Sequence, residues 1–152
     1  MKLTEDQLTL WGRRIGREIR IPVFIGLKGP LGAGKSVFAR AVAIGAGVDD
    51  ELPSPTFNVL FRYPAGDVAS LVHADLYRLD SPNELAEIGW EEVLGENGIV
   101  LVEWPERAGD ALPQDRWEIE LDFPKGEPNL RTVSVERHGA PSHLPGFPVS
   151  IT

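Results

Sequence analysis

The sequence predicts an α/β fold in three layers, in which a mixed parallel and antiparallel sheet of the P-loop NTPase type is flanked by helices. First, an apolar run over residues 22–27 leads through a glycine-rich loop into apolar residues at helical spacing up to residue 43. Second, the apolar strand 98–103 ends on a carboxylate. Third, alternating segments predict two antiparallel hairpins, formed by residues 58–63 with 68–73 and by residues 117–123 with 130–136.

The chain of 152 residues is long enough for one domain with a sizeable core. We expect a single domain over residues 1–138 and an extended or disordered proline-rich tail over residues 139–152. No apolar run is long enough to cross a bilayer, and the start lacks the apolar core of a signal peptide. The absence of cysteine excludes disulfides and thiolate metal sites, so we expect a cytoplasmic protein without membrane contact. The net charge of −8 argues against a large basic footprint for direct nucleic-acid binding. It suits docking on a basic protein surface, although an acidic surface is usually just a solubility feature.

The first predicted helix begins at a capping box, with Thr4 as N-cap and Gln7 at the third helical position. Apolar residues then recur on one face as far as about Arg20. Gly12 and Gly16 within this helix either weaken it or permit close packing.

The loop after the first strand matches the pattern GxxxxGK[ST], the P-loop that binds nucleotide phosphates. It consists of Gly29, Pro30, Leu31, Gly32, Ala33, Gly34, Lys35 and Ser36, and Val37 follows as a further nucleotide-binding candidate. The glycines allow positive φ angles, so that backbone N–H groups point inward at the start of a helix. Lys35 can reach the β- and γ-phosphates, and Ser36 can offer its hydroxyl to Mg²⁺. The alternative is a plain glycine turn, but the full motif between a strand and a helix favours the nucleotide site.

Later segments complete the predicted fold. Glycines at 45 and 47 end the P-loop helix. A second capping box, residues 81–84, begins a helical stretch to Leu94 that is interrupted near Gly89.

Two carboxylates are candidates for the metal side of the site. Asp75 follows the strand 68–73, and Glu103 ends an apolar run of the Walker B type. Since ligands of open α/β sheets bind beyond the carboxyl ends of parallel strands, both could face the phosphates. One would bind the metal while the other orients the attacking water, and the pattern alone favours Glu103 as the metal ligand. The alternative for each is a surface carboxylate at a strand end.

Three further residues near these motifs are candidates for the site. Thr56 could close on Mg²⁺ and the γ-phosphate as a switch residue, although an ST-turn or a helix cap explains it equally well. Trp104 lies beside Glu103 in a segment expected to be an exposed loop, where core or interface roles are commoner than nucleotide contact. His73 could pair with Asp75 on a metal, but a hydrogen-bonded strand-end histidine is favoured.

Four motifs occur in an order that resembles the bacterial TsaE (YjeE) family of small P-loop ATPases. They are the P-loop, Ser54-Pro55-Thr56-Phe57, His73-Ala74-Asp75-Leu76-Tyr77-Arg78-Leu79 and Val102-Glu103-Trp104-Pro105-Glu106. The likeness covers about Thr4 to Glu136. The P-loop alone is shared by many families, whereas the other three motifs are much more specific.

The resemblance implies a role in making N6-threonylcarbamoyladenosine at position 37 of tRNAs that read ANN codons. In that family the protein binds a TsaB–TsaD heterodimer, and TsaD transfers the threonylcarbamoyl group. The resemblance thus implies a partner-stimulated ATP hydrolase with ATP and Mg²⁺ as cofactors, which supports repeated cycles and meets tRNA only through the complex.

The resemblance also assigns roles to single residues. Lys35 and Ser36 match the phosphate and Mg²⁺ positions, and Thr56 matches the switch-like threonine. Asp75 matches the Mg²⁺-associated aspartate, which reverses the ranking from the pattern alone. Glu103 matches the acidic residue proposed to act in hydrolysis, while it remains a candidate metal ligand.

The neighbouring Trp104 matches the nucleotide-sensitive tryptophan of the family. Ser36 and Val37 stand where the family often has two threonines, and Ser36 retains the hydroxyl that Mg²⁺ binding needs.

Other P-loop functions remain as alternatives. A small-molecule or nucleoside kinase would need an arginine-bearing lid and an acceptor pocket, for which the chain has little room. A GTPase is disfavoured because no N-K-x-D base-reading motif is present. A nucleotide-gated binding module without hydrolysis would not need Lys35, Ser36 and two carboxylates together.

Overall fold

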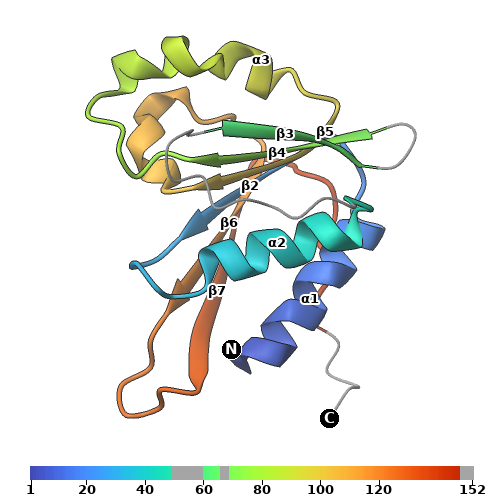
Figure 1. Cartoon of the computed structure of the whole chain (residues 1–152), viewed down its shortest axis with the longest axis vertical. Helices are drawn as coiled ribbons and strands as arrows, with labels where there is room; N and C mark the ends of the chain where they lie inside the picture. Colours follow the sequence, from blue (N-terminus) through green and yellow to red (C-terminus); the bar gives the residue numbers. More distant parts are fainter. Residues whose placement is uncertain (49–59, 66–68, 148–152) are drawn as a thin grey trace.

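The described residues form one mixed seven-stranded sheet with the order β1-β7-β6-β2-β5-β4-β3 (Figure 1). The computed structural model describes residues 1–48, 60–65 and 69–147. The strands are β1 (Lys2–Thr4), β2 (Val23–Lys28), β3 (Leu60–Ala65), β4 (Ala69–Asp75), β5 (Gly98–Glu103), β6 (Arg116–Asp122) and β7 (Leu130–His138). Strands β6, β2, β5 and β4 run parallel to one another, and the outer strands pair antiparallel. The predicted mixed sheet and both predicted hairpins are confirmed.

Helices cover both faces of this sheet, which confirms the predicted three layers (Figure 1). On one face lie α1 (Glu5–Glu18) and α2 (Lys35–Gly45), and on the other lie the 3₁₀ helices η1 (Pro82–Ile88) and η2 (Pro105–Ala111) with the short α3 (Trp90–Leu94). Neighbouring residues of β2 serve different cores: Ile25 packs in the α1–α2 layer, and Phe24 packs edge-to-face on Trp90. Burial on both faces explains why β2 is apolar from Val23 to Leu27 rather than alternating.

The capping box and the glycines of α1 have clear structural roles. The Gln7 amide donates to Thr4 Oγ1 at 3.1 Å, and the Thr4 amide donates to Gln7 Oε1 at 2.9 Å, so the predicted box is confirmed. A Cβ on Gly12 would lie 2.8 Å from Ala41 Cβ, and one on Gly16 would overlap the carbonyl oxygen of Val42. Both glycines therefore permit close packing of α1 on α2, which decides between the two interpretations left open by the sequence.

The helical stretch predicted before β5, with its interruption near Gly89, is confirmed. Its first part is a 3₁₀ helix that ends at Gly89, whose φ is 76°, and one α-helical turn follows. Ser81 accepts from the Asn83 amide at 3.1 Å, but the Glu84 carboxylate accepts from the Asp80 amide at 3.0 Å. In a capping box Glu84 would accept from the amide of the N-cap Ser81, but here it accepts from the amide of the preceding residue, Asp80. Of the turn predicted at residues 64–67, Pro64 and Ala65 belong to β3, and residues 66 and 67 lie outside the described residues.

Residues 139–147 follow β7 without forming helix or strand. The indole of Trp11 donates to the Pro145 carbonyl, and that of Trp117 donates to the Ser142 carbonyl, both at 2.8 Å. Leu144 is buried in the α1–α2 core. This part of the tail is thus attached to the domain by its backbone carbonyls. None of the helices in the described part of the chain is long and apolar enough to span a membrane.

Candidate functional site

The glycine-rich loop joins β2, in the middle of the sheet, to the N-terminus of α2 (Figure 1). Gly29, Gly32 and Gly34 have φ angles of 133°, 80° and 102°, a region that side chains with a Cβ rarely adopt. At Gly29 a Cβ would also overlap the Leu121 carbonyl. Gly34, the N-cap of α2, provides no side-chain acceptor for the first-turn N–H groups. These groups are therefore available to an anion at the positive end of the helix.

A pocket of about 320 Å³ opens beside this loop. The P-loop supplies one wall, and the carboxyl ends of β4 and β5 supply the other. Its lining residues are Leu31, Gly32, Gly34, Lys35, Ser36, Val37, Asp75, Glu103 and Trp104. All of them are candidates predicted from the sequence, while Gly29, Pro30 and Ala33 lie in the loop without lining this pocket. Thr56 lies outside the described residues.

Lys35 begins α2 and is only 4% exposed. Its ammonium donates to the Gly29 carbonyl and lies 3.7 Å from the centroid of the Trp104 ring. Desolvation by burial lowers the pKa of Lys35, although the charges of Glu103, Asp75 and Glu106 oppose this effect. A partly dehydrated ammonium gains more from an anion than a hydrated one does, because water no longer screens the pair.

Glu103 connects the P-loop helix to the sheet. The Ser36 hydroxyl lies 3.2 Å from each carboxylate oxygen of Glu103, and His73 Nε2 lies 2.6 Å from Glu103 Oε2. Glu103 is 3% exposed, so it is a buried carboxylate, and both of its oxygens have polar partners. The favoured interpretation of His73 as a hydrogen-bonded histidine is confirmed, and its partner is Glu103.

Asp75 lies beside Glu103 because the two residues are register partners at the ends of β4 and β5. Its carboxylate accepts from the Tyr77 amide at 2.9 Å. Burial is the main cause that raises the pKa of Asp75, and the charge of Glu103 adds to it, against the opposing Tyr77 hydrogen bond and the charges of His73 and Lys35. Two neighbouring carboxylates are stabilised by a cation between them.

The donor set of the pocket fits Mg²⁺. Ser36, Asp75 and Glu103 all line the pocket and offer hard oxygen ligands, which this cation prefers. With its proton directed to Glu103, the Ser36 hydroxyl keeps its lone pairs free for a cation.

Trp104 has a backbone conformation that sequence patterns did not indicate. Its φ of 59° and ψ of 50° are left-handed, which is unusual for a bulky residue. Its amide donates to the Leu27 carbonyl at 3.1 Å, and its ring packs at 5.0 Å from that of Tyr77. The loop predicted after Trp104 is wrong, since the 3₁₀ helix η2 follows and buries Pro105, whereas the predicted exposure of Glu106 and Arg107 is confirmed.

Two contacts of the site were not predicted from the sequence. They are the hydrogen bond between His73 and Glu103 and the packing of Tyr77 on Trp104. One signal in the sequence pointed to a place for His73 at the site. Alternate residues of a strand lie on one face, so His73 and Asp75 must share a face of β4.

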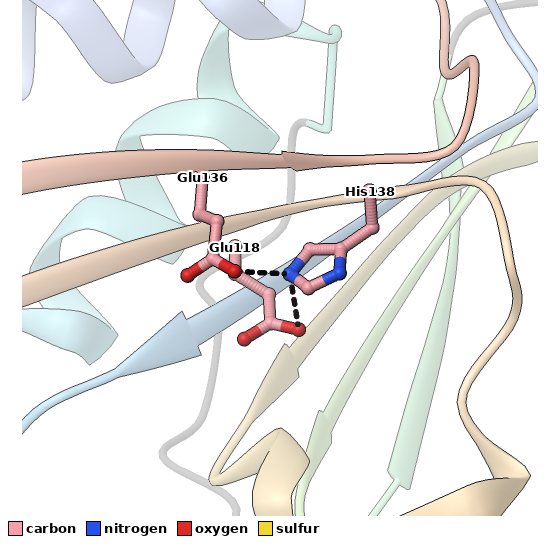
Figure 2. Close-up of side chains that lie close together, drawn as sticks. All are labelled: Glu118, Glu136 and His138. Carbon is pink, nitrogen blue, oxygen red and sulfur yellow. Dashed lines mark ion pairs between the residues drawn. The ribbon is translucent and has the colours of Figure 1, made fainter.

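A second polar cluster lies on β6 and β7 (Figure 2). His138 Nε2 lies 3.2 Å from Glu118 Oε2 and 3.0 Å from Glu136 Oε1, close enough for the three side chains to hold a cation. Glu118 is already paired with Arg116 Nε at 2.7 Å and Lys28 Nζ at 3.5 Å. These positive side chains neutralise the carboxylate, so the cluster is an ion-pair network.

Comparisons with known proteins identify the family to which this chain is similar. The model of the family "Threonylcarbamoyl adenosine biosynthesis protein TsaE" matches residues 3–131. Similar proteins named "tRNA threonylcarbamoyladenosine biosynthesis protein TsaE" occur in Treponema pallidum (36% identity over 111 residues, 73% of this chain and 81% of the relative) and Rickettsia felis (32% over 144 residues, 94% and 82%). The crystal structure of YdiB from Bacillus subtilis has the same fold, with a TM-score of 0.70, 24% identity and coverage of 91% of this chain and 86% of that one. The chain belongs to the TsaE family.

Proposed function

We propose that this chain is an ATP hydrolase that acts in the threonylcarbamoylation of adenosine 37 in tRNAs that read ANN codons. Its partner is a TsaB–TsaD heterodimer, and ATP binding and hydrolysis support repeated cycles without this chain transferring the threonylcarbamoyl group. Contact with tRNA is made through the complex, in the cytoplasm. Membership of the TsaE family supports the pathway, and the names of the relatives assign those proteins to tRNA threonylcarbamoyladenosine biosynthesis.

One observation supports hydrolysis above all: Lys35 and Ser36 of the P-loop share a pocket with two carboxylates, Asp75 and Glu103, from neighbouring parallel strands. A module that only binds nucleotide needs the loop and its lysine. Glu103 is buried and Asp75 is partly buried, and carboxylates removed from water cost free energy unless they are compensated. Such a pair at the phosphate end suits a site that handles a cation and a water molecule.

Each part of the loop has a defined task in this proposal. The N–H groups at the start of α2 and the Lys35 ammonium stabilise the negative charge that develops on the transferred phosphoryl group. Lys35 exchanges its bond to the Gly29 carbonyl for one to a phosphate oxygen, which replaces a neutral acceptor by a charged one. Phosphate binding is thereby favoured over the contact that holds the side chain in place.

The oxygen ligands divide into two roles. We assign the Ser36 hydroxyl and the Asp75 carboxylate to Mg²⁺, and Glu103, next to both, to the attacking water. The cation, when bound, neutralises charge on the β- and γ-phosphate oxygens. Thr56 completes the proposal as a switch residue that closes on the γ-phosphate side.

The test measures ATP turnover and tRNA modification with purified components. Turnover by the chain alone should be slow and should rise when the TsaB–TsaD pair is added. Lys35→Ala should abolish this rise and multiple rounds of modification, whereas Lys125→Ala, at an exposed lysine outside the pocket, should behave as wild type. Multiple rounds with Lys35→Ala at the wild-type rate would contradict the proposal. Transfer of the labelled γ-phosphate to a small acceptor would instead identify a kinase.

A further inference from the structure

We propose that His73 is a positioning residue that fixes the carboxylate of Glu103 for the hydrolytic step, an inference that rests on the function proposed above. The side chains of His73 and Glu103 are 5% and 4% exposed, and Nε2 lies 2.6 Å from Oε2. A short contact between two buried polar groups is stronger than the same contact in water, because the local dielectric is low.

The register of β4 and β5 places His73 next to Glu103. Strands β4 and β5 are parallel neighbours, with Asp75 opposite Glu103 and His73 opposite Leu101. Since alternate residues of a strand share a face, His73 and Asp75 point to the same side of β4, the side on which Leu71 and Leu101 pack beneath α2. The imidazole therefore reaches diagonally to the carboxylate at the end of the adjacent strand.

His73 gives Glu103 an orientation that Ser36 alone does not. The Ser36 hydroxyl lies 3.2 Å from both carboxylate oxygens, so it does not distinguish them. The imidazole contacts Oε2 only, which fixes the rotation of the carboxylate about its last bond. Oε1 has no contact to the imidazole, which leaves it as the oxygen that can engage a further group.

The hydrogen between His73 Nε2 and Glu103 Oε2 can be assigned from the chemistry of the two groups. An ionised carboxylate only accepts hydrogen bonds, so Nε2 of His73 carries the hydrogen and donates it to Glu103. Among the described residues Nδ1 has no hydrogen-bond partner. Glu103 is therefore the polar partner that the described structure gives to this imidazole.

Three substitutions at position 73 test this inference through ATP turnover of the full chain with the TsaB–TsaD pair. His73→Leu removes the donor and should lower kcat about 10- to 100-fold, as loss of an orienting partner typically does, with nucleotide affinity changed less than about threefold. His73→Gln places an amide N–H near the position of Nε2 and should restore kcat to within about threefold of wild type. His73→Asn, which is too short to reach Glu103, should not. His138→Gln, in the ion-pair network on β6 and β7, is the matched control and should leave kcat unchanged.

The comparison of glutamine with asparagine decides the outcome even if His73→Leu does not fold. A kcat for His73→Gln at least about fivefold above that for His73→Asn, at equal nucleotide affinity, supports positioning. Equal kcat values for the two variants would overturn it.

A second measurement does not depend on turnover. Long-range ¹H–¹⁵N correlation spectra of the free chain at neutral pH report which imidazole nitrogen is protonated. A protonated Nε2 on His73, with a signal that shifts in Glu103→Gln, supports the inference, and an unprotonated Nε2 would overturn it. If the spectra show the bond but the wild-type complex lacks Lys35-dependent turnover, the proposed function has failed and the hydrogen bond has not.

Discussion

The Lys35 ammonium lies 3.7 Å from the centroid of the Trp104 ring, although the two residues belong to different walls of the pocket. A cation over the face of an indole is attracted by the negative charge of the ring face. The same ammonium donates to the Gly29 carbonyl, so it is held inside the pocket rather than extended into solvent. The left-handed backbone of Trp104 directs the ring to this place, at the point where β5 ends.

The first prediction concerns the fluorescence of Trp104. When Lys35 moves from the indole face to a phosphate, the local field at the ring changes. We therefore expect Mg²⁺ and an ATP analogue to alter tryptophan emission, and Trp104→Phe to remove most of that change. Lys35→Ala should also remove it, because the ammonium is the group that moves.

Trp117→Phe is the matched control for this measurement. Trp117 lies on β6 and donates to Ser142, outside the pocket, so this variant should keep the nucleotide-dependent signal. A signal that survives Trp104→Phe and disappears in Trp117→Phe would show that the moving group is not at the P-loop.

The local elements of this fold could be predicted from sequence, and the order of the strands in the sheet could not. The strand, glycine loop and helix of the P-loop follow from apolar spacing and from three glycines, which act within a few residues. The contact between His73 and Glu103 depends on which strands are neighbours, although the two residues are 30 positions apart. Strand order depends on tertiary packing, and the periodicity of a local sequence segment contains no information about it. The three-residue strand β1 was missed because it is too short for any pattern.

The second prediction separates the two carboxylates. Asp75→Asn preserves an acceptor for the Tyr77 amide but removes a charge from the cation side, so Mg²⁺-dependent nucleotide binding should weaken about 10- to 100-fold. Glu103→Gln should leave binding largely intact and slow partner-stimulated turnover about 10²- to 10⁴-fold, the usual contribution of a general base. Calorimetric titration and steady-state kinetics measure the two effects.

The exposed Asp110 provides a control, and Asp110→Asn should change neither quantity. An equal loss of nucleotide affinity in the Asp75 and Glu103 variants would reject this division of roles.

The third prediction concerns the close packing of α1 on α2. Alanine in place of Gly16 gains about 1 kcal/mol of helix propensity, but its Cβ overlaps the Val42 carbonyl, which belongs to backbone and cannot turn away. We expect Gly16→Ala to lower the free energy of unfolding by about 1–3 kcal/mol, as overpacking does. At Gly95 a Cβ would have only ordinary contacts, at 3.7 and 3.8 Å, and φ is −92°. Gly95→Ala should therefore lie within about 0.5 kcal/mol of wild type in chemical denaturation, and an equal effect of both changes would contradict the packing argument.

The fourth prediction uses the ion-pair network on β6 and β7 (Figure 2). Burial alone raises the pKa of Glu118, but the hydrogen bond and charge of Arg116, with the charges of His138 and Lys28, outweigh it and place the pKa below the ordinary 4.5. A carboxylate with a lowered folded-state pKa stabilises the fold above its ordinary pKa, and this stabilisation is lost as the pH falls through the folded-state value.

Glu118→Gln should consequently lower the free energy of unfolding at pH 7 by about 1.5–3 kcal/mol, the usual value of a hydrogen bond to a charged group. Because wild-type Glu118 becomes protonated in acid, the difference between the two proteins should shrink as the pH falls below 4.5, the ordinary value. Urea denaturation at several pH values measures it, with the exposed Glu120→Gln on the same strand as control, expected within about 0.5 kcal/mol of wild type. A difference that stays constant from pH 7 into acid would mean that Glu118 stabilises the sheet through packing, since packing does not depend on the proton.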